Sequence, residues 1–90
     1  MSGTYLDAAI RRRTEINLQE VGREAILHDQ RLAKAHVING SAARIWELCD
    51  GRDLDSLVGA FAGLYGRSPD DVRADVARVL ASFRSLDLLE

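Results

Sequence analysis

Residues 32–50 read LAKAHVINGSAARIWELCD, and within them the hydrophobic period changes from two residues to about 3.6. LAKAHVI alternates between two faces, as a strand does. In SAARIWELCD, Ile45 and Cys49 lie on one stripe, as on a helix buried along one side. Asn39 or Ser41 can cap this helix, because a short polar side chain there accepts hydrogen bonds from free backbone N–H groups. The segment therefore predicts a strand followed directly by a helix.

Two further strands are predicted before this segment. In RTEINLQEV, residues 13–21, Ile16 and Leu18 share one face while polar side chains share the other. A turn at Gly22 and Arg23 leads into EAILHD, residues 24–29. Short connections between consecutive strands favour an antiparallel meander, with LAKAHVI as its third strand.

Two further helices are predicted after it. Asp53 can cap the first of them, and Gly66 ends it, since glycine readily adopts the left-handed conformation that closes a helix. Gly51 is expected to end the preceding helix in the same way. Ser68 and Pro69 begin the last helix, as a cap and a first helical residue. The sequence thus predicts one α+β domain over residues 1–90, a winged-helix-like fold in which a three-stranded antiparallel sheet precedes three helices, with residues 1–12 frayed.

Composition excludes several classes of protein. The 90 residues are 47% hydrophobic and 29% charged, which is ordinary for a globular chain and excludes a disordered one. A single cysteine excludes an internal disulfide framework and suits a reducing compartment. We find no secretory signal and no apolar run of about 20 residues, the length of a membrane span. These features predict a cytoplasmic domain without membrane contact.

Groups for catalysis or metal binding are sparse. His28, His36 and Cys49 do not have the spacing of a metal site, and Cys49 is expected to be a small core residue. A triad of Ser41, His36 and Asp50 would lack an oriented nucleophile and an oxyanion hole. We therefore predict no catalytic residue, no metal and no cofactor.

Basic residues leave one alternative function open. The run Arg11 to Arg13 is expected to be a solvated strand edge. Arg73, Arg78 and Arg84 on the last helix could contact DNA, as in a winged-helix protein. Acidic side chains on the same segment and a net charge of -2 argue against nucleic acid, because they repel phosphates.

The second half of the chain carries a family resemblance. A strand ending in Asn, a helix start of small residues, an Ile-x-x-Leu-x-Asp-Gly block, a Tyr-Gly pair and an Asp-Val pair follow one another in order. The residues are Asn39, Ala42, Ala43, Ile45, Leu48, Asp50, Gly51, Tyr65, Gly66, Asp75 and Val76. In this pattern the chain resembles the PqqD-like proteins, which share the RiPP recognition element. Asp53 stands where the family commonly has Thr, an equivalent cap.

The resemblance implies that the protein delivers a peptide to an enzyme. Such domains bind the leader peptide of a ribosomally synthesised precursor as a strand added to the third strand, in a cleft against the last helix. They present it to a maturation enzyme, often a radical SAM protein. Main-chain pairing would give register, and side-chain pockets would give selectivity. The peptide-binding residues expected here are Lys34, Ala35, His36, Val37 and Ile38 on the strand and Arg73, Ala77, Leu80 and Arg84 on the helix. A self-associating scaffold, a homodimer paired through the same sheet edge, is a further alternative.

Overall fold

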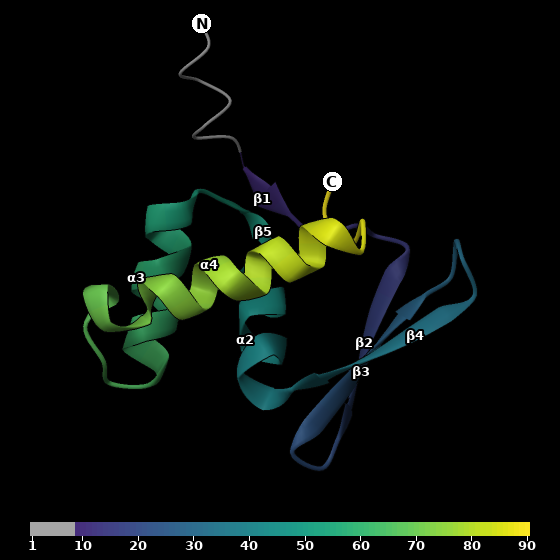
Figure 1. Ribbon diagram of the computed structural model, residues 1–90, viewed down its shortest axis with the longest axis horizontal. Coiled ribbons are helices and arrows are strands. Elements are labelled where there is room, and N and C mark those ends of the chain that lie inside the picture. The colour runs from purple at the N-terminus through teal and green to yellow at the C-terminus, as the bar shows by residue number, and fades with distance from the viewer. Residues whose placement is uncertain (1–8) are drawn as a thin grey trace, which may run out of the picture.

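A computed structural model of the chain describes residues 9–90 (Figure 1). Its order of elements confirms the predicted α+β fold, in which a three-stranded antiparallel sheet precedes three helices. The elements are β1 (Ile10–Arg11), β2 (Ile16–Val21), β3 (Glu24–Asp29), β4 (Lys34–Asn39), α2 (Gly40–Leu48), β5 (Asp50–Arg52), α3 (Leu54–Leu64) and α4 (Pro69–Ser85).

The main sheet has the strand order β2-β3-β4, with both neighbouring pairs antiparallel. Ala25, Leu27 and Asp29 of the central strand are buried on the face that α2 covers. The third strand begins later than predicted, at Lys34, because Ala33 has a φ of 53° in the preceding turn. The meander therefore leaves β4 at one edge of the sheet.

The helices begin at the residues that the sequence indicates. The Oδ1 atom of Asn39 accepts a hydrogen bond from the backbone N–H of Ala42 at 2.8 Å, so Asn39 is the cap of α2. Asp53 caps α3 in the same way, and Ser68 caps α4 ahead of a proline. Each cap lies within three residues of the donor it binds, which makes it readable from sequence.

The core lies between the helices and the inner face of the sheet. Trp46 of α2 contacts Phe83 of α4 edge to face, with ring centroids 5.3 Å apart. Leu27 of β3 and Leu80 of α4 belong to the same buried cluster. Since these residues come from three elements, the cluster fixes α2 and α4 against the sheet.

A second, two-stranded sheet was not predicted. β1 pairs antiparallel with β5, and Arg12 forms a bridge with Leu89. The prediction of a frayed start is therefore wrong for residues 9–12, because burial of Ile10 holds this segment in place; residues 1–8 lie outside the described range. Gly51 does not end α2 either: the helix ends at Leu48, and Gly51 lies within β5 with a φ of 108°.

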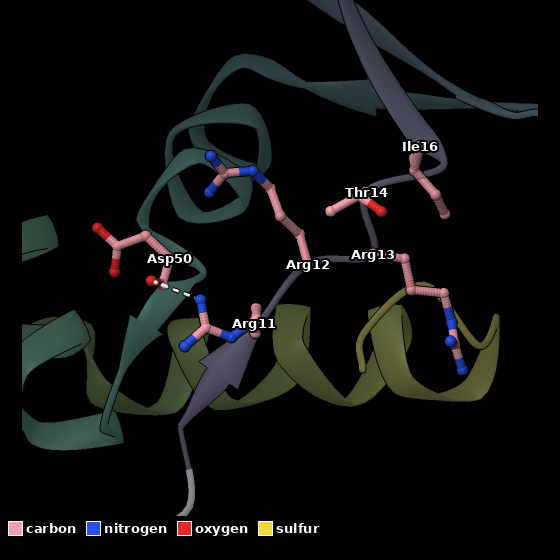
Figure 2. A pocket seen from close by; sticks show the side chains of 6 residues that line it. All are labelled: Arg11, Arg12, Arg13, Thr14, Ile16 and Asp50. Atoms are coloured by element: carbon pink, nitrogen blue, oxygen red, sulfur yellow. Dashed lines mark hydrogen bonds between the residues drawn. The ribbon is translucent and has the colours of Figure 1, made fainter.

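The arginine run is a solvated strand edge only at Arg11, which is exposed on β1, whereas the side chains of Arg12 and Arg13 point toward other elements (Figure 2). Nη1 of Arg12 donates to the carbonyl oxygens of Glu47 at 3.0 Å and Cys49 at 3.1 Å, at the end of α2. Nε of Arg13 donates to the carbonyl oxygen of Asp87, just beyond α4. A guanidinium at a helix C-terminus satisfies free carbonyl groups and complements the helix dipole. Two of these arginines thus close helix ends.

Replacement of Arg12 by Met should lower the free energy of unfolding by about 1 kcal/mol, since the change keeps the apolar stem and removes the donors to α2. Urea denaturation measures this difference. The matched control is Arg23→Met in the exposed turn between β2 and β3. Equal stability of the two variants would show that Arg12 does not act as a helix cap.

Candidate functional site

Among residues 9–90, the outer edge of β4 is one of the two unpaired edges of the main sheet, and β2 has the other. Within residues 9–90, β4 pairs with β3 alone, so its other edge is free to pair with a further strand. Lys34, His36 and Ile38 lie on the same face as the buried Leu27, with His36 directly opposite it in register. Val37 lies on the outer face and is 65% exposed. The edge therefore combines unpaired backbone with an accessible apolar side chain.

The four helix residues expected beside this strand lie elsewhere. Leu80 is 1% exposed and belongs to the core, so its prediction as a surface contact is wrong. Nη1 of Arg73 donates to Asp55 of α3 at 3.0 Å. Ala77 and Arg84 are exposed, and the 100° helical spacing puts them on the same flank as Arg73. This flank runs from the start of α3 toward Cys49. Arg84 is close enough to Cys49 for its positive charge to act on the pKa of the thiol.

The opposite flank of α4 lies beside the end of β4. Asp75, Arg78 and Val79 share a pocket with Asn39, the last residue of β4, and with Ser41. The buried residues of α4, Val72, Val76, Leu80 and Phe83, form one stripe along the helix, and this stripe has a flank on each side. Which flank lies beside the strand depends on how α4 crosses α2, and no local pattern encodes that crossing.

This pocket, which we call the α2–α4 pocket, has a volume of about 340 Å³. Its wall comes from three helices and the residues that flank them. The lining residues are Asn39, Ser41, Ile45, Phe61, Tyr65, Arg67, Val72, Asp75, Arg78 and Val79. From the sequence, Asn39 and Ser41 are predicted only as caps, and Ile45 only as a buried helix residue. The signal that could have indicated a surface role is Tyr65, an aromatic side chain just beyond the end of a helix.

The arginines of α4 do not gather into a basic surface. Arg73 pairs with Asp55, and Arg78 pairs with Asp75 at 2.7 Å. Each of these cations thus has a carboxylate beside it, which reduces its attraction for phosphate. The arrangement does not favour nucleic-acid binding.

The side chains that could be reactive, Cys49 and His28, make structural contacts. Cys49 is completely buried, its Sγ donates to the carbonyl oxygen of Ile45 at 3.2 Å, and burial raises the pKa of its thiol to about 12. This confirms its predicted place in the core. Nε2 of His28 lies 2.8 Å from Oε1 of Gln19 on the exposed side of the sheet. Among residues 9–90, no group of His, Cys, Asp and Glu side chains could hold a metal ion.

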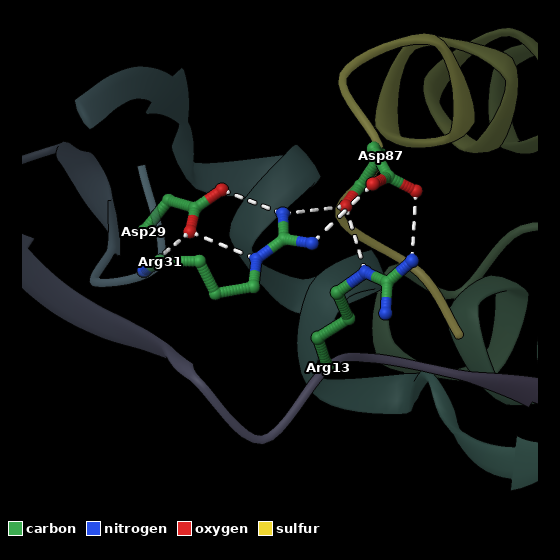
Figure 3. A network of polar contacts seen from close by, with 4 residues as sticks. All are labelled: Arg13, Asp29, Arg31 and Asp87. Atoms are coloured by element: carbon green, nitrogen blue, oxygen red, sulfur yellow. Dashed lines mark hydrogen bonds and ion pairs between the residues drawn. The ribbon is translucent and has the colours of Figure 1, made fainter. Parts of the chain in front are cut away.

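A network of ion pairs fixes the turn before β4 (Figure 3). Arg31 of this turn donates to both carboxylate oxygens of Asp29, at 2.7 and 3.1 Å. It also reaches Asp87 beyond α4, where Arg13 binds the second carboxylate oxygen at 2.8 Å. Hydrogen bonds from Arg31 lower the pKa of Asp29, and those from Arg13 and Arg31 lower the pKa of Asp87. The network holds the start of β4 against the end of α4.

Comparison with known proteins places this architecture. Residues 16–89, from β2 to the segment after α4, match the family described as coenzyme PQQ synthesis protein D (PqqD). The chain belongs to the PqqD family. None of the curated proteins compared with the chain gives a significant match.

Two solved structures show the PqqD-family fold of the chain. One is TbiB1 in complex with the TbiA(beta) leader peptide, with a TM-score of 0.73, 20% identity, and 89% of this chain and 94% of that chain covered. The other is the solution structure of a PqqD truncation of Methylobacterium extorquens PqqCD, described as a functional, stand-alone RiPP recognition element. Its TM-score is 0.70 and its identity 22%, with 89% of this chain and 86% of that chain covered.

The PqqD match spans all the parts of the candidate site. It includes β4, α4 and the whole α2–α4 pocket, and it leaves out β1. Within residues 9–90, no helix has the length and apolar character needed to cross a membrane. The edge of β4 and the neighbouring pocket are therefore the surfaces of this PqqD-family chain on which a functional proposal can be built.

Proposed function

We propose that this chain binds the leader peptide of a ribosomally synthesised precursor as a strand added to β4. The chain presents the peptide to a maturation enzyme, for which the family resemblance favours a radical SAM protein, and carries out no chemistry itself. Residues 1–90 act as one recognition domain. The observation that carries this proposal is the open edge of β4, next to a pocket between helices.

The physical basis is strand addition. Backbone N–H and C=O groups along β4 give an extended peptide its register with little demand on its sequence. Lys34, His36 and Ile38 would then contact peptide side chains on the inner face, while Ala35 and Val37 would flank those on the outer face. The ion pairs of Arg31 support this role, because they fix the start of β4 and lower the cost of ordering the edge on binding.

We place the helix side of the binding surface on the flank of α4 that carries Asp75, Arg78 and Val79. These residues share a pocket with Asn39 of β4, whereas Arg73 is paired with Asp55. The flank that carries Arg73, Ala77 and Arg84 is left out of the proposed surface. Leu80 contributes by supporting the core beneath it.

Titration of ¹⁵N-labelled protein with synthetic leader peptides, taken from precursors encoded beside its gene, tests this proposal. We expect one of them to give saturable amide shifts concentrated on Lys34–Asn39, with slower hydrogen exchange along the outer edge of β4. A control peptide with the same side chains and N-methylated backbone nitrogens should bind much more weakly, because it cannot donate to the strand. Leader binding that leaves the β4 amides unmoved, or equal binding of the N-methylated peptide, would refute strand addition.

A further inference from the structure

A second pocket lies where β1 pairs with β5, in the two-stranded sheet and apart from the sheet that contains β4. We call it the arginine pocket, and its volume is about 330 Å³. Its lining residues are Arg11, Arg12, Arg13, Thr14, Ile16 and Asp50 (Figure 2). The PqqD match begins at residue 16, so the three arginines lie outside the segment that matches the family. The pocket is therefore a feature that this chain adds to the matched PqqD segment.

The arginine pocket carries an excess of positive charge. Asp50 accepts hydrogen bonds from Arg52 on both carboxylate oxygens, at 2.7 and 2.9 Å, and these bonds lower its pKa to about 2. Arg13 is paired with Asp87. Among residues 9–90, no carboxylate lies within ion-pair distance of Arg12. The charge of Asp50 is thus already compensated by another side chain, whereas the charge of Arg12 is not.

Arg11 is exposed, but its guanidinium group is held in place. Nη1 donates to the backbone oxygen of Asp50 at 3.4 Å, and the group lies against the backbone of Gly51. A Cβ atom at position 51 would come within 2.5 Å of Nη2, so only glycine leaves room for this placement. Nε of Arg11 lies 4.0 Å from Oε1 of Glu90, at the outer limit of an ion pair. Arg11 therefore offers a positioned cation that can bind a carboxylate more closely than it binds Glu90.

The surroundings favour a carboxylate over a phosphate as the ligand. The negative charges of Asp50 and Glu90 lie beside the arginines, and they repel a multiply charged anion more strongly than a singly charged one. Both side chains of the Arg11–Glu90 pair are about half exposed, and an exposed pair of this length contributes little stability. A carboxylate from another molecule can therefore take the place of Glu90 at small cost.

The position of the pocket suits an enzyme that receives the peptide, a partner whose identity rests on the proposed function. The leader then occupies the free edge of β4, so the enzyme has to contact the chain elsewhere. The arginine pocket belongs to the other sheet, and a strand that pairs with β4 leaves it accessible. Arg13 links the two surfaces, because it shares Asp87 with Arg31 of the turn before β4. An enzyme bound at the pocket is thereby kept close to the start of the strand that carries the leader.

We propose that the arginine pocket binds an acidic segment of the maturation enzyme, with a Glu or Asp carboxylate of that segment paired to Arg11 and Arg12. A guanidinium group can bind a carboxylate through two parallel hydrogen bonds. Arg12 contributes its charge while its Nη1 stays on the carbonyl groups at the end of α2. Charges at such a surface speed association and select the partner more than they add affinity, so the contact should weaken with salt.

A short acidic peptide tests the pocket without the enzyme. Acetyl-Glu-Glu-Glu-amide, at millimolar concentration and low ionic strength, should shift the side-chain Nε–H signals of Arg11 and Arg12 saturably. Glu90→Gln should tighten this binding about twofold, because it removes the competing carboxylate. Acetyl-Gln-Gln-Gln-amide is the control and should give no shift. No saturable shift with the acidic peptide, or tighter binding of inorganic phosphate, would overturn the inference.

The maturation enzyme encoded beside the gene tests the partner. Arg11→Gln should weaken that complex about fivefold at low salt, and the difference should fall below about twofold in about 0.5 M NaCl. The same variant should bind the leader peptide as the parent does, because Arg11 lies in the other sheet. Arg23→Gln removes the same charge from the exposed turn between β2 and β3, and this matched control should leave the complex unchanged. Thermal unfolding of both variants is measured first.

The two experiments separate this inference from the proposed function. Equal affinity of parent and Arg11→Gln for the enzyme at low salt would overturn the inference, and leader shifts on β4 would then leave the proposed function standing. If the acidic peptide shifts the Arg11 signal saturably while no leader peptide moves the β4 amides, the failure lies in the proposed function. The arginine pocket is then retained as a site for acidic segments.

Discussion

Leu80→Ala should lower the free energy of unfolding by about 2–5 kcal/mol, a large share of the total for a domain of this size. Leu80 is 1% exposed and lies in the cluster that joins α2, α4 and the sheet, so truncation leaves a cavity that its neighbours cannot fill without moving. Urea denaturation at pH 7 measures the loss. The slope of the transition should stay unchanged if the variant still unfolds in two states.

Val79→Ala is the control on the same helix. Val79 packs against the core but is only half-buried, so its truncation should cost about 1 kcal/mol or less. A Leu80→Ala protein within about 0.5 kcal/mol of the parent would contradict the core assignment and return Leu80 to the surface residues.

Asp29→Asn should cost much more stability at pH 7 than at pH 3. Hydrogen bonds from Arg31 lower the pKa of Asp29 in the folded protein below its ordinary value of 3.8. The unfolded chain therefore binds a proton first as the pH falls, and the contribution of this carboxylate, complete above about pH 5, is lost as the pH falls toward the folded-state pKa. Asp87 has a lowered pKa as well and adds to the same acid-side loss in the parent.

Denaturant titrations of parent and variant at both pH values measure this dependence. Glu15→Gln removes an exposed carboxylate before β2 and should cost little at either pH, which provides the control. A cost of Asp29→Asn that is the same at pH 3 and pH 7 would show that the ionised carboxylate does not stabilise the turn before β4.

The parts of the fold that could be predicted from sequence depend on neighbours in the chain. Asn39, Asp53 and Ser68 each bind a backbone N–H three residues on, so the starts of α2, α3 and α4 were each indicated by a few residues. The alternation of β2 and β3 was readable for the same reason, because successive side chains point to opposite faces.

The parts that could not be predicted depend on long-range contacts. Arg12 and Arg13 read as a charge run, yet they bind groups at least 34 residues away in the chain, at the ends of α2 and α4. β5 is three residues long and exists because it pairs with β1. The strand residues predicted to bind the peptide, residues 34–38, all lie on β4. The predicted helix residues lie on the flank of α4 that faces α3 or, for Leu80, in the core. The helical period shows which residues are buried, but it does not show which element lies beside each flank of the helix.

The single tryptophan gives the protein a built-in optical reporter of its tertiary structure. Trp46 is 2% exposed and lies against Phe83, so its emission is set by the interior where α2 and α4 meet. A peptide bound at the edge of β4 leaves the indole of Trp46 in the same surroundings, whereas unfolding of the core exposes it to water. Tryptophan emission therefore reports on folding, and peptide binding has to be measured from the signals of surface groups.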